Sequence, residues 1–253
     1  MQNKLIDENI KFEKQINPII SVIMTIYNQA HLISACLRSI QNQSFKKIEI
    51  IIVDDCSLDN STEIVKEFQK EDPRIIFIQH DSNEGTIKTR TDGIRKAKGK
   101  YITIIDGDDA FIHEDVLKNC LYIAEKANLD LVEFQMGVFK DEKLVYIVRI
   151  YPQLNLSYII NQPELKTKFI YDNKNFPKDF PNRSICGKLI SKELFNKMLE
   201  DIGSEYTDDY INYAEDTIMV VSLLHLANSY YFMKELGYFI SKDTYIFIFS
   251  IIL

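Results

Sequence analysis

The chain has 253 residues, 46% of them hydrophobic and 26% charged, which is ample for a sizeable core. Its formal net charge of -7 argues against general nucleic-acid binding, because such binding depends on a positive surface that displaces counterions from phosphates. The four cysteines are scattered without a CxxC pair, which favours buried thiols in a reducing compartment. We therefore expect a cytoplasmic globular protein that binds no nucleic acid.

Residues 1–17 are rich in charged side chains and lack the apolar core of a signal peptide, so we interpret them as an N-terminal extension. After them, apolar runs rich in β-branched residues predict four strands: 19–26, 48–53, 74–79 and 101–105. Between these runs, apolar residues at helical spacing predict three helices: 31–43, about 60–70 and 86–98. Such alternation is typical of a parallel sheet with crossover helices.

The pattern is looser after residue 109. We predict further helices over 113–126 and 192–199, and strands over 129–134, 144–150 and 184–190. Residues 151–181 have no clear period, and we interpret them as a long connection with a short helix near 163–170. A last helix follows Glu215 and Asp216, and its predicted apolar face consists of Ile218, Val221, Leu224 and His225.

Residues 245–253 are strongly apolar but shorter than the about 18 residues that a membrane-spanning helix needs. We expect a final strand or docked segment there. The alternatives are a peripheral contact with the inner face of a membrane and a cut through a longer protein.

The most acidic strand end follows the run at 101–105. Asp106, Asp108 and Asp109 lie within four residues, and Gly107 would let the chain turn sharply between them. Close carboxylates repel one another and raise one another's pKa, so a cation or the donors of a ligand would stabilise them. A divalent metal is one hypothesis. The other is a solvated turn in which Asp109 or a neighbour caps the next helix.

Two other predicted strands also end in polar residues. Thr25, Tyr27 and Asn28 lie at the end of the first strand, and Asp54 and Asp55 at the end of the second. Ligands of parallel α/β sheets bind outside the carboxyl ends of the strands, so this coincidence predicts a ligand site at one sheet edge. The sequence has no GxGxxG after the first strand and no GxxxxGKS/T, which argues against a dinucleotide fold and a P-loop.

With these motifs the sequence resembles the family 2 glycosyltransferases. The order and spacing agree over residues 18–125, and weaker similarity continues to Glu215 and Asp216. The resemblance implies an α/β fold of GT-A type, with a mostly parallel twisted sheet flanked by helices. Residues 18–125 would form the nucleotide-sugar-binding half, and the smaller part at 126–253 would bind the acceptor. The matching segments are 21–28, 52–59, 83–85, 89–90 and 99–109.

The resemblance also implies site residues and a reaction, in which a sugar passes from a nucleotide diphosphate to a hydroxyl with inversion. Asp108, together with Asp106, would bind Mn²⁺ or Mg²⁺, the hard cations that carboxylates and phosphates hold together. One departure is Thr91, which stands where the family often has asparagine. The nucleotide-sugar-binding residues implied in this way are Thr25, Tyr27, Asp55, Arg90 and Asp106.

By the same resemblance, Asp216 matches the catalytic base that takes the proton of the acceptor hydroxyl. The residues alone leave an alternative open, because an acid in the first turn of a helix is also stabilised by the helix dipole.

We expect a glycosyltransferase of class EC 2.4 that uses a UDP-sugar and a glycan or lipid-linked glycan acceptor in polysaccharide biosynthesis. One alternative is a nucleotidyltransferase, although residues 27–30 lack its glycine-rich basic loop. A phosphoacceptor signalling domain would need a different order of acidic strand ends. A noncatalytic nucleotide-sugar-binding protein is the remaining alternative.

Overall fold

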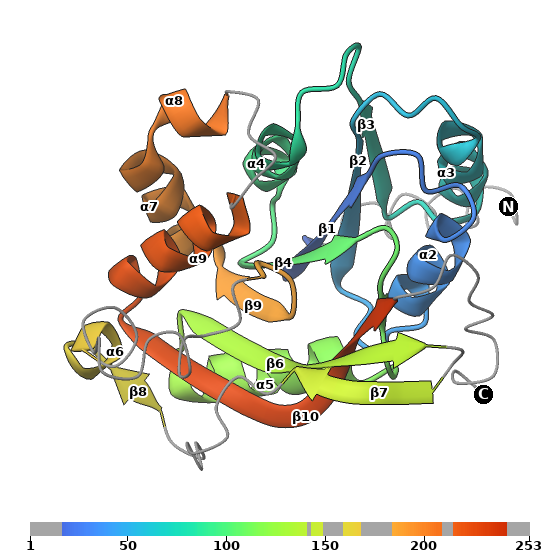
Figure 1. The fold of residues 1–253 in the computed structure, drawn as a ribbon. Coiled ribbons are helices and arrows are strands. Elements are labelled where there is room, and N and C mark those ends of the chain that lie inside the picture. The colour runs from blue at the N-terminus through green and yellow to red at the C-terminus, as the bar shows by residue number, and fades with distance from the viewer. Residues whose placement is uncertain (1–16, 141–142, 149–158, 168–183, 209–214, 242–253) are drawn as a thin grey trace, which may run out of the picture.

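The computed structural model describes residues 17–140, 143–148, 159–167, 184–208 and 215–241. Ten strands form one sheet, with helices on both sides of it (Figure 1). The sheet order is β3-β2-β1-β4-β9-β6-β10-β5, and β7 and β8 pair with β6 and β10. The fold is therefore the predicted α/β architecture with a central sheet flanked by helices.

The N-terminal half of the sheet is parallel, as predicted. Every residue of β1 and β2 is buried, because helices cover both faces and a continuous apolar run is what such strands require. Thr25 in β1 pairs with Val53 on one side and with Asp106 on the other, so the polar strand ends share one sheet edge. The four strands are β1 (Ile20–Ile26), β2 (Ile48–Asp54), β3 (Ile75–Gln79) and β4 (Tyr101–Asp106).

The three predicted crossover helices are present. The first two lie on one side of the parallel strands and the third on the other (Figure 1). The first helix begins after Leu32 without a side-chain cap. Before it, Asn28 adopts a left-handed conformation, and its Oδ1 accepts a hydrogen bond from the Leu58 amide at 2.7 Å. The helices are α2 (Ile33–Gln41), α3 (Ser61–Glu71) and α4 (Thr86–Lys96).

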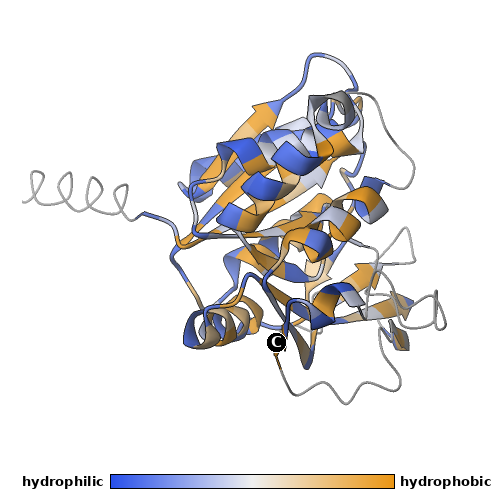
Figure 2. Cartoon of the chain, turned by 90° about the vertical axis from the view of Figure 1, so that its left-hand side faces the viewer, coloured by the Kyte–Doolittle hydropathy of each residue, from blue (hydrophilic) through white to orange (hydrophobic). Residues whose placement is uncertain are grey.

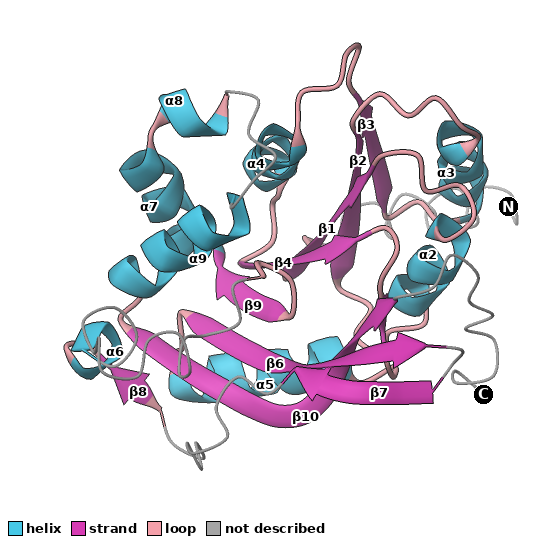
Figure 3. Cartoon of the chain, in the orientation of Figure 1, coloured by secondary structure: helices cyan, strands magenta, loops and turns pink. Residues whose placement is uncertain are grey.

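The C-terminal half of the sheet is mixed. β9 runs antiparallel to β4 and β6, whereas β10 runs parallel to β6 (Figure 3). The strands of this half are β5 (Ala110–Phe111), β6 (Leu131–Lys140), β7 (Lys143–Val148), β8 (Ile160–Asn161), β9 (Lys188–Ser191) and β10 (Ser229–Ser241). The helices are α5 (Val116–Ala127), α6 (Glu164–Lys166), α7 (Lys192–Ile202), α8 (Ser204–Thr207) and α9 (Glu215–Leu226).

Two predictions for this half are wrong. Sequence analysis assigns no strand to β10, yet it pairs with β6 along most of its length. The predicted apolar face of α9 is wrong in part. Leu224 is buried as predicted, but Ile218 and Val221 are only partly buried. The other apolar residues that are buried are Met219, Val220 and Leu223. α9 is apolar almost all round, so its spacing does not identify the face that packs.

Hydrophobic residues fill the strands, and polar residues cover much of the outer helix surfaces (Figure 2). No helix in the described part of the chain is long and apolar enough to cross a membrane. Residues 245–253, for which we predict a strand or a membrane contact, lie outside the described residues.

Candidate active site

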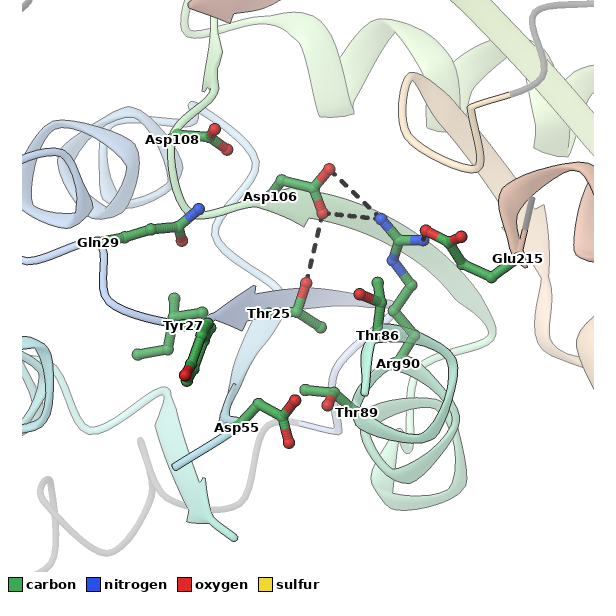
Figure 4. Close-up of a pocket in the computed structure, with 11 residues that line it drawn as sticks. Thr25, Tyr27, Gln29, Asp55, Thr86, Thr89, Arg90, Asp106, Asp108 and Glu215 are labelled. Carbon is green, nitrogen blue, oxygen red and sulfur yellow. Dashed lines mark hydrogen bonds and ion pairs between the residues drawn. The ribbon is translucent and has the colours of Figure 1, made fainter. Parts of the chain in front are cut away.

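A cavity of about 310 Å³ opens at the carboxyl ends of the parallel strands. Asp106 and Asp108 lie at one end of it, and Tyr27 and Asp55 lie at the other (Figure 4). The structure thus brings together six of the seven predicted site residues. The seventh, Asp216, does not line the cavity but follows the lining residue Glu215 directly in the sequence. The lining residues are Thr25, Ile26, Tyr27, Gln29, Asp55, Thr86, Thr89, Arg90, Asp106, Asp108 and Glu215.

Asp55 is held by the loop between β3 and α4. Its Oδ1 accepts a hydrogen bond from the Glu84 amide at 2.7 Å, and its Oδ2 accepts one from the Gly85 amide at 2.9 Å. Gly85 has φ 87°, a conformation that favours glycine and that turns two successive N–H groups toward one carboxylate. The carboxylate is consequently fixed before any ligand binds.

The neighbouring Asp54 has a different role. It is fully buried, and its Oδ2 accepts a hydrogen bond from Thr62 Oγ1 at 2.7 Å. Its Oδ1 accepts from the Ser57 amide at 3.0 Å, so Asp54 ties the end of β2 to the start of α3. Of the two acids at the carboxyl end of β2, only Asp55 lines the cavity.

Arg90 joins the two halves of the site. Its guanidinium donates to Asp106 Oδ1 at 3.0 Å (Figure 4). It also donates to Asp216 Oδ1, and Glu215 Oε1 lies 3.7 Å from Arg90 Nη1. The Arg90 side chain is only 4% exposed, so these acids balance a buried charge. The nearby carboxylates, first Asp106 and then Asp216, outweigh burial and raise the pKa of Arg90, so it stays protonated.

The three acids at the carboxyl end of β4 lie in different environments. Asp106 lies in the ion pair with Arg90 and accepts a hydrogen bond from Thr25 Oγ1 at 3.3 Å. Asp108 lines the cavity, and burial, followed by the charge of Asp106, raises its pKa. Asp109 is buried beneath them and accepts from the Ser241 amide at 3.2 Å, so the alternative that it caps α5 is wrong.

The donor set fits a divalent cation only in part. Within the described residues, no group of three acidic, histidine or cysteine side chains is arranged to hold a metal. Mg²⁺ and Mn²⁺ sites, however, often use one or two carboxylates and take their other oxygens from substrate phosphates and water. Asp108 faces the cavity with a raised pKa that a nearby cation would lower, so it and Asp106 fit such a partial set.

Asp216 lies in the first turn of α9, close to the cavity. Burial raises its pKa, and the charge of Arg90 opposes this shift without cancelling it. A carboxylate with a raised pKa is a stronger base than an exposed aspartate, which suits it to accept a proton near neutral pH.

Sequence analysis assigned no role to several residues that line the cavity. Thr86 and Thr89 lie in the first turn of α4, directly after the Gly85 turn, and Gln29 follows Tyr27 by two positions. Their nearness to a predicted strand end is a signal that the sequence carries. Glu215 stands beside Asp216, but sequence analysis gave a role to Asp216 alone.

Sequence comparison identifies the family. The profile described as "Glycosyl transferase family 2" matches residues 21–199. "Glycosyltransferase GlyA" of Streptococcus pneumoniae is 30% identical over 193 residues, which are 76% of this chain and 27% of that protein. "Uncharacterized glycosyltransferase EpsJ" of Bacillus subtilis is 28% identical over 234 residues, covering 89% of this chain and 61% of the relative. The chain thus spans less than two thirds of the length of either relative.

Structure comparison gives the same result for the fold. The crystal structure of S. aureus TarS 1-349 in complex with UDP-GlcNAc matches with a TM-score of 0.68 and 21% identity, over 91% of this chain and 60% of TarS 1-349. The mannosyltransferase PcManGT from Pyrobaculum calidifontis, in complex with GDP-Man and Mn²⁺, matches with a TM-score of 0.60 and 18% identity, over 89% of this chain and 57% of PcManGT. These likenesses confirm the GT-A type of fold, and the profile match shows that the chain belongs to glycosyl transferase family 2.

Proposed function

We propose that the protein transfers a sugar from a UDP-sugar to a hydroxyl of a glycan or lipid-linked glycan, with inversion and with the help of a divalent cation. The observation that carries this proposal is a single cavity with a different polar group at each end. Asp55, a fixed hydrogen-bond acceptor, lies at one end, and the carboxylates of Asp106 and Asp108 lie at the other. This arrangement suits a ligand with a base at one end and a diphosphate at the other.

The nucleoside would occupy the end of the cavity at Tyr27 and Asp55. Tyr27 is 46% exposed and lines the cavity, so its ring is open to stack on a base. Asp55 can accept an N–H of that base. Thr25 lies between this end and the acids, and Thr89 lies beside Asp55, so their hydroxyl groups can meet a ribose (Figure 4). The comparison with TarS supports a uridine nucleotide, since that protein is seen with UDP-GlcNAc.

The diphosphate would lie near Asp108 and Asp106. Two carboxylates repel a diphosphate, so a cation is needed between them, and PcManGT is seen with Mn²⁺. A bound Mn²⁺ or Mg²⁺ would supply charge neutralisation of the departing diphosphate. Asp108 would hold it from the cavity wall, and Asp106 would orient the donor while it remains paired with Arg90.

Asp216 would act as the general base. The acceptor oxygen forms a bond to the anomeric carbon, the bond from that carbon to the diphosphate oxygen breaks, and Asp216 takes the acceptor proton. Attack opposite to the leaving group inverts the anomeric centre. Such proton transfer contributes typically about 10²–10⁴-fold to the rate. Arg90 holds Asp216 in place for this step through a direct hydrogen bond.

The acceptor is proposed from the relatives. A Campylobacter jejuni relative, named "GalNAc(5)-diNAcBac-PP-undecaprenol beta-1,3-glucosyltransferase", is 32% identical over 142 residues, which are 50% of this chain and 46% of that protein. Its name describes a lipid-linked glycan acceptor, and we propose the same class here. Residues 18–125 would bind the donor and 126–253 the acceptor, at or near the inner face of a membrane.

A donor panel tests the proposal. UDP-, GDP-, ADP- and CDP-sugars are mixed with the protein and an undecaprenyl-diphosphate-linked sugar, with and without Mn²⁺. We expect release of UDP and a thermal shift with UDP-sugars only when Mn²⁺ is present. Release of pyrophosphate in a parallel reaction that contains UTP and a sugar 1-phosphate would identify a nucleotidyltransferase instead. Binding without turnover against a series of acceptors would favour a noncatalytic binding protein.

A further inference from the structure

His80, the residue after β3, contacts the acid that we place against the nucleotide base. Its Nδ1 lies 3.0 Å from Asp55 Oδ1, and its Nε2 lies 3.3 Å from Asp92 Oδ2 in α4. The His80 side chain is 10% exposed, and its backbone amide donates to the Asp54 carbonyl at 2.9 Å. The imidazole is therefore held at Nδ1 and at the backbone, while Nε2 is buried beside Asp92 without a hydrogen-bond partner among the described residues.

The chemistry of the pair determines which atom donates. A carboxylate that accepts two backbone amides is an acceptor only, so the contact with Asp55 is favourable only when His80 Nδ1 carries the hydrogen. Asp92 is itself fixed by two ion pairs. Lys88 Nζ lies 2.6 Å from Asp92 Oδ2, and Arg95 Nη1 lies 3.2 Å from Asp92 Oδ1. The hydrogen bond from Nδ1 to Asp55 therefore sets the orientation of the ring.

These contacts leave Asp55 with little free acceptor capacity. A carboxylate has about four acceptor positions, two on each oxygen. On Oδ1, the Glu84 amide and His80 Nδ1 take both positions. On Oδ2, the Gly85 amide takes one position, so one remains for a ligand in the cavity that Asp55 lines.

We propose that His80 is a specificity-determining residue that restricts Asp55 to a single hydrogen bond from the base. Uracil presents one N–H at its imide. Guanine presents two adjacent donors, N1–H and the exocyclic amine, and needs a free position on each carboxylate oxygen to satisfy both. A donor of the base that faces an occupied oxygen loses its water without gaining a partner, so the occupied Oδ1 selects against guanine. This inference rests on the proposed function, because it assumes that a nucleotide base meets Asp55.

The test compares UDP with GDP by isothermal titration calorimetry in the presence of Mn²⁺, for the wild type and two variants. His80→Leu removes the donor and leaves one free position on Oδ1. His80→Asn is the matched control, because its amide nitrogen replaces Nδ1 in a side chain of similar shape to leucine. Circular dichroism and thermal unfolding show whether each variant is folded.

We expect the wild type and His80→Asn to bind UDP about tenfold more tightly than GDP, which is the effect of one hydrogen bond to a charged group. In His80→Leu this ratio should fall by about tenfold, mainly through tighter GDP binding. A wild type that binds GDP as tightly as UDP would overturn the inference without any variant. So would a folded His80→Leu protein whose ratio is unchanged. If the wild type binds no nucleotide at all, the proposed function fails as well. If it binds nucleotides without preferring UDP, only the inference about His80 fails.

Discussion

Arg90 of α4 donates a hydrogen bond to Asp216 of α9, although 126 residues separate them in the chain. The same guanidinium donates to Asp106 at the end of β4, so one buried cation holds an acid from each half of the protein. A planar guanidinium can serve two carboxylates at once, which an ammonium on a flexible stem does less well. Arg90 therefore fixes the distance between the proposed donor site and the proposed base.

Replacing Arg90 with lysine should separate donor binding from transfer. Lysine keeps the charge but cannot donate to both Asp106 and Asp216 in the same planar geometry. We expect the rate of transfer to fall about 100-fold, because a small displacement of a catalytic group has effects of this size. The KM for the donor should change by less than about fivefold. Steady-state kinetics of UDP release measure both quantities.

Arg38→Lys is the control for this experiment, because Arg38 is exposed on α2 and contacts the ring of Phe68. It should leave transfer unchanged. A folded Arg90→Lys enzyme with near-normal transfer would show that the bridge between the two acids is unimportant.

Asp108→Asn should abolish the effect of Mn²⁺ on donor binding. Asparagine keeps the shape of the side chain but loses the charge that attracts a hard cation. Calorimetric titration of UDP with and without Mn²⁺ should show a clear difference for the wild type and none for the variant. Asp115→Asn is the control, since Asp115 is an acid at the start of α5 that bonds to Ser44 and Lys118. Mn²⁺-dependent binding that persists in Asp108→Asn would place the cation elsewhere.

Asp216→Asn should remove transfer and leave UDP binding nearly intact, because Asp216 does not line the cavity. In the wild type, burial raises the pKa of Asp216 despite the opposing charge of Arg90. The base is protonated and inactive below this pKa, so kcat should fall as the pH drops through a value above that of an ordinary aspartate. A pH profile of kcat measures this acid limb. Normal turnover by Asp216→Asn would assign the base to another residue.

The position of the site could be predicted from the sequence, because parallel strands place their carboxyl ends at one edge. Thr25, Asp55 and Asp106 follow apolar runs, and register alone brings Thr25 beside Asp106. The different roles of Asp54 and Asp55 could not be predicted, since they depend on which donors surround each carboxylate. The same is true of the contact between Arg90 and Asp216, which depends on how α9 packs.

Gly107 shows how a correct expectation can rest on the wrong cause. The sequence predicts a sharp turn there, but the φ of Gly107 is not positive. A Cβ at this position would instead clash with Gln29 Oε1 and lie 2.8 Å from Ile26 Cγ2. At Gly99, between α4 and β4, a Cβ would lie 2.7 Å from the Ser21 amide nitrogen. In both cases residues distant in the sequence approach the backbone closely, and only the three-dimensional structure shows this.

Asp72 gives a prediction about stability that is independent of the site. It follows α3, and its carboxylate accepts hydrogen bonds from Arg74 at 2.9 and 2.7 Å and from Gln41 at 3.1 Å. Burial raises the pKa of Asp72, but the hydrogen bonds and the charge of Arg74 outweigh it, so the pKa is lowered in the folded state. A lowered carboxylate pKa contributes stability that is fully present above the unfolded pKa of about 3.9.

This contribution should disappear as the pH falls through the lowered folded pKa, because the proton then binds both states equally. Asp72→Asn should therefore lower the free energy of unfolding by about 1 kcal/mol at pH 7, a size typical of a partly exposed charged hydrogen bond. The difference from the wild type should shrink below about pH 4. Urea unfolding at pH 7, 5 and 3 measures it, with Glu71→Gln on the exposed end of α3 as a charge-matched control. A difference that stays constant down to pH 3 would mean that the ionised carboxylate of Asp72 contributes nothing, and that the variant acts through packing alone.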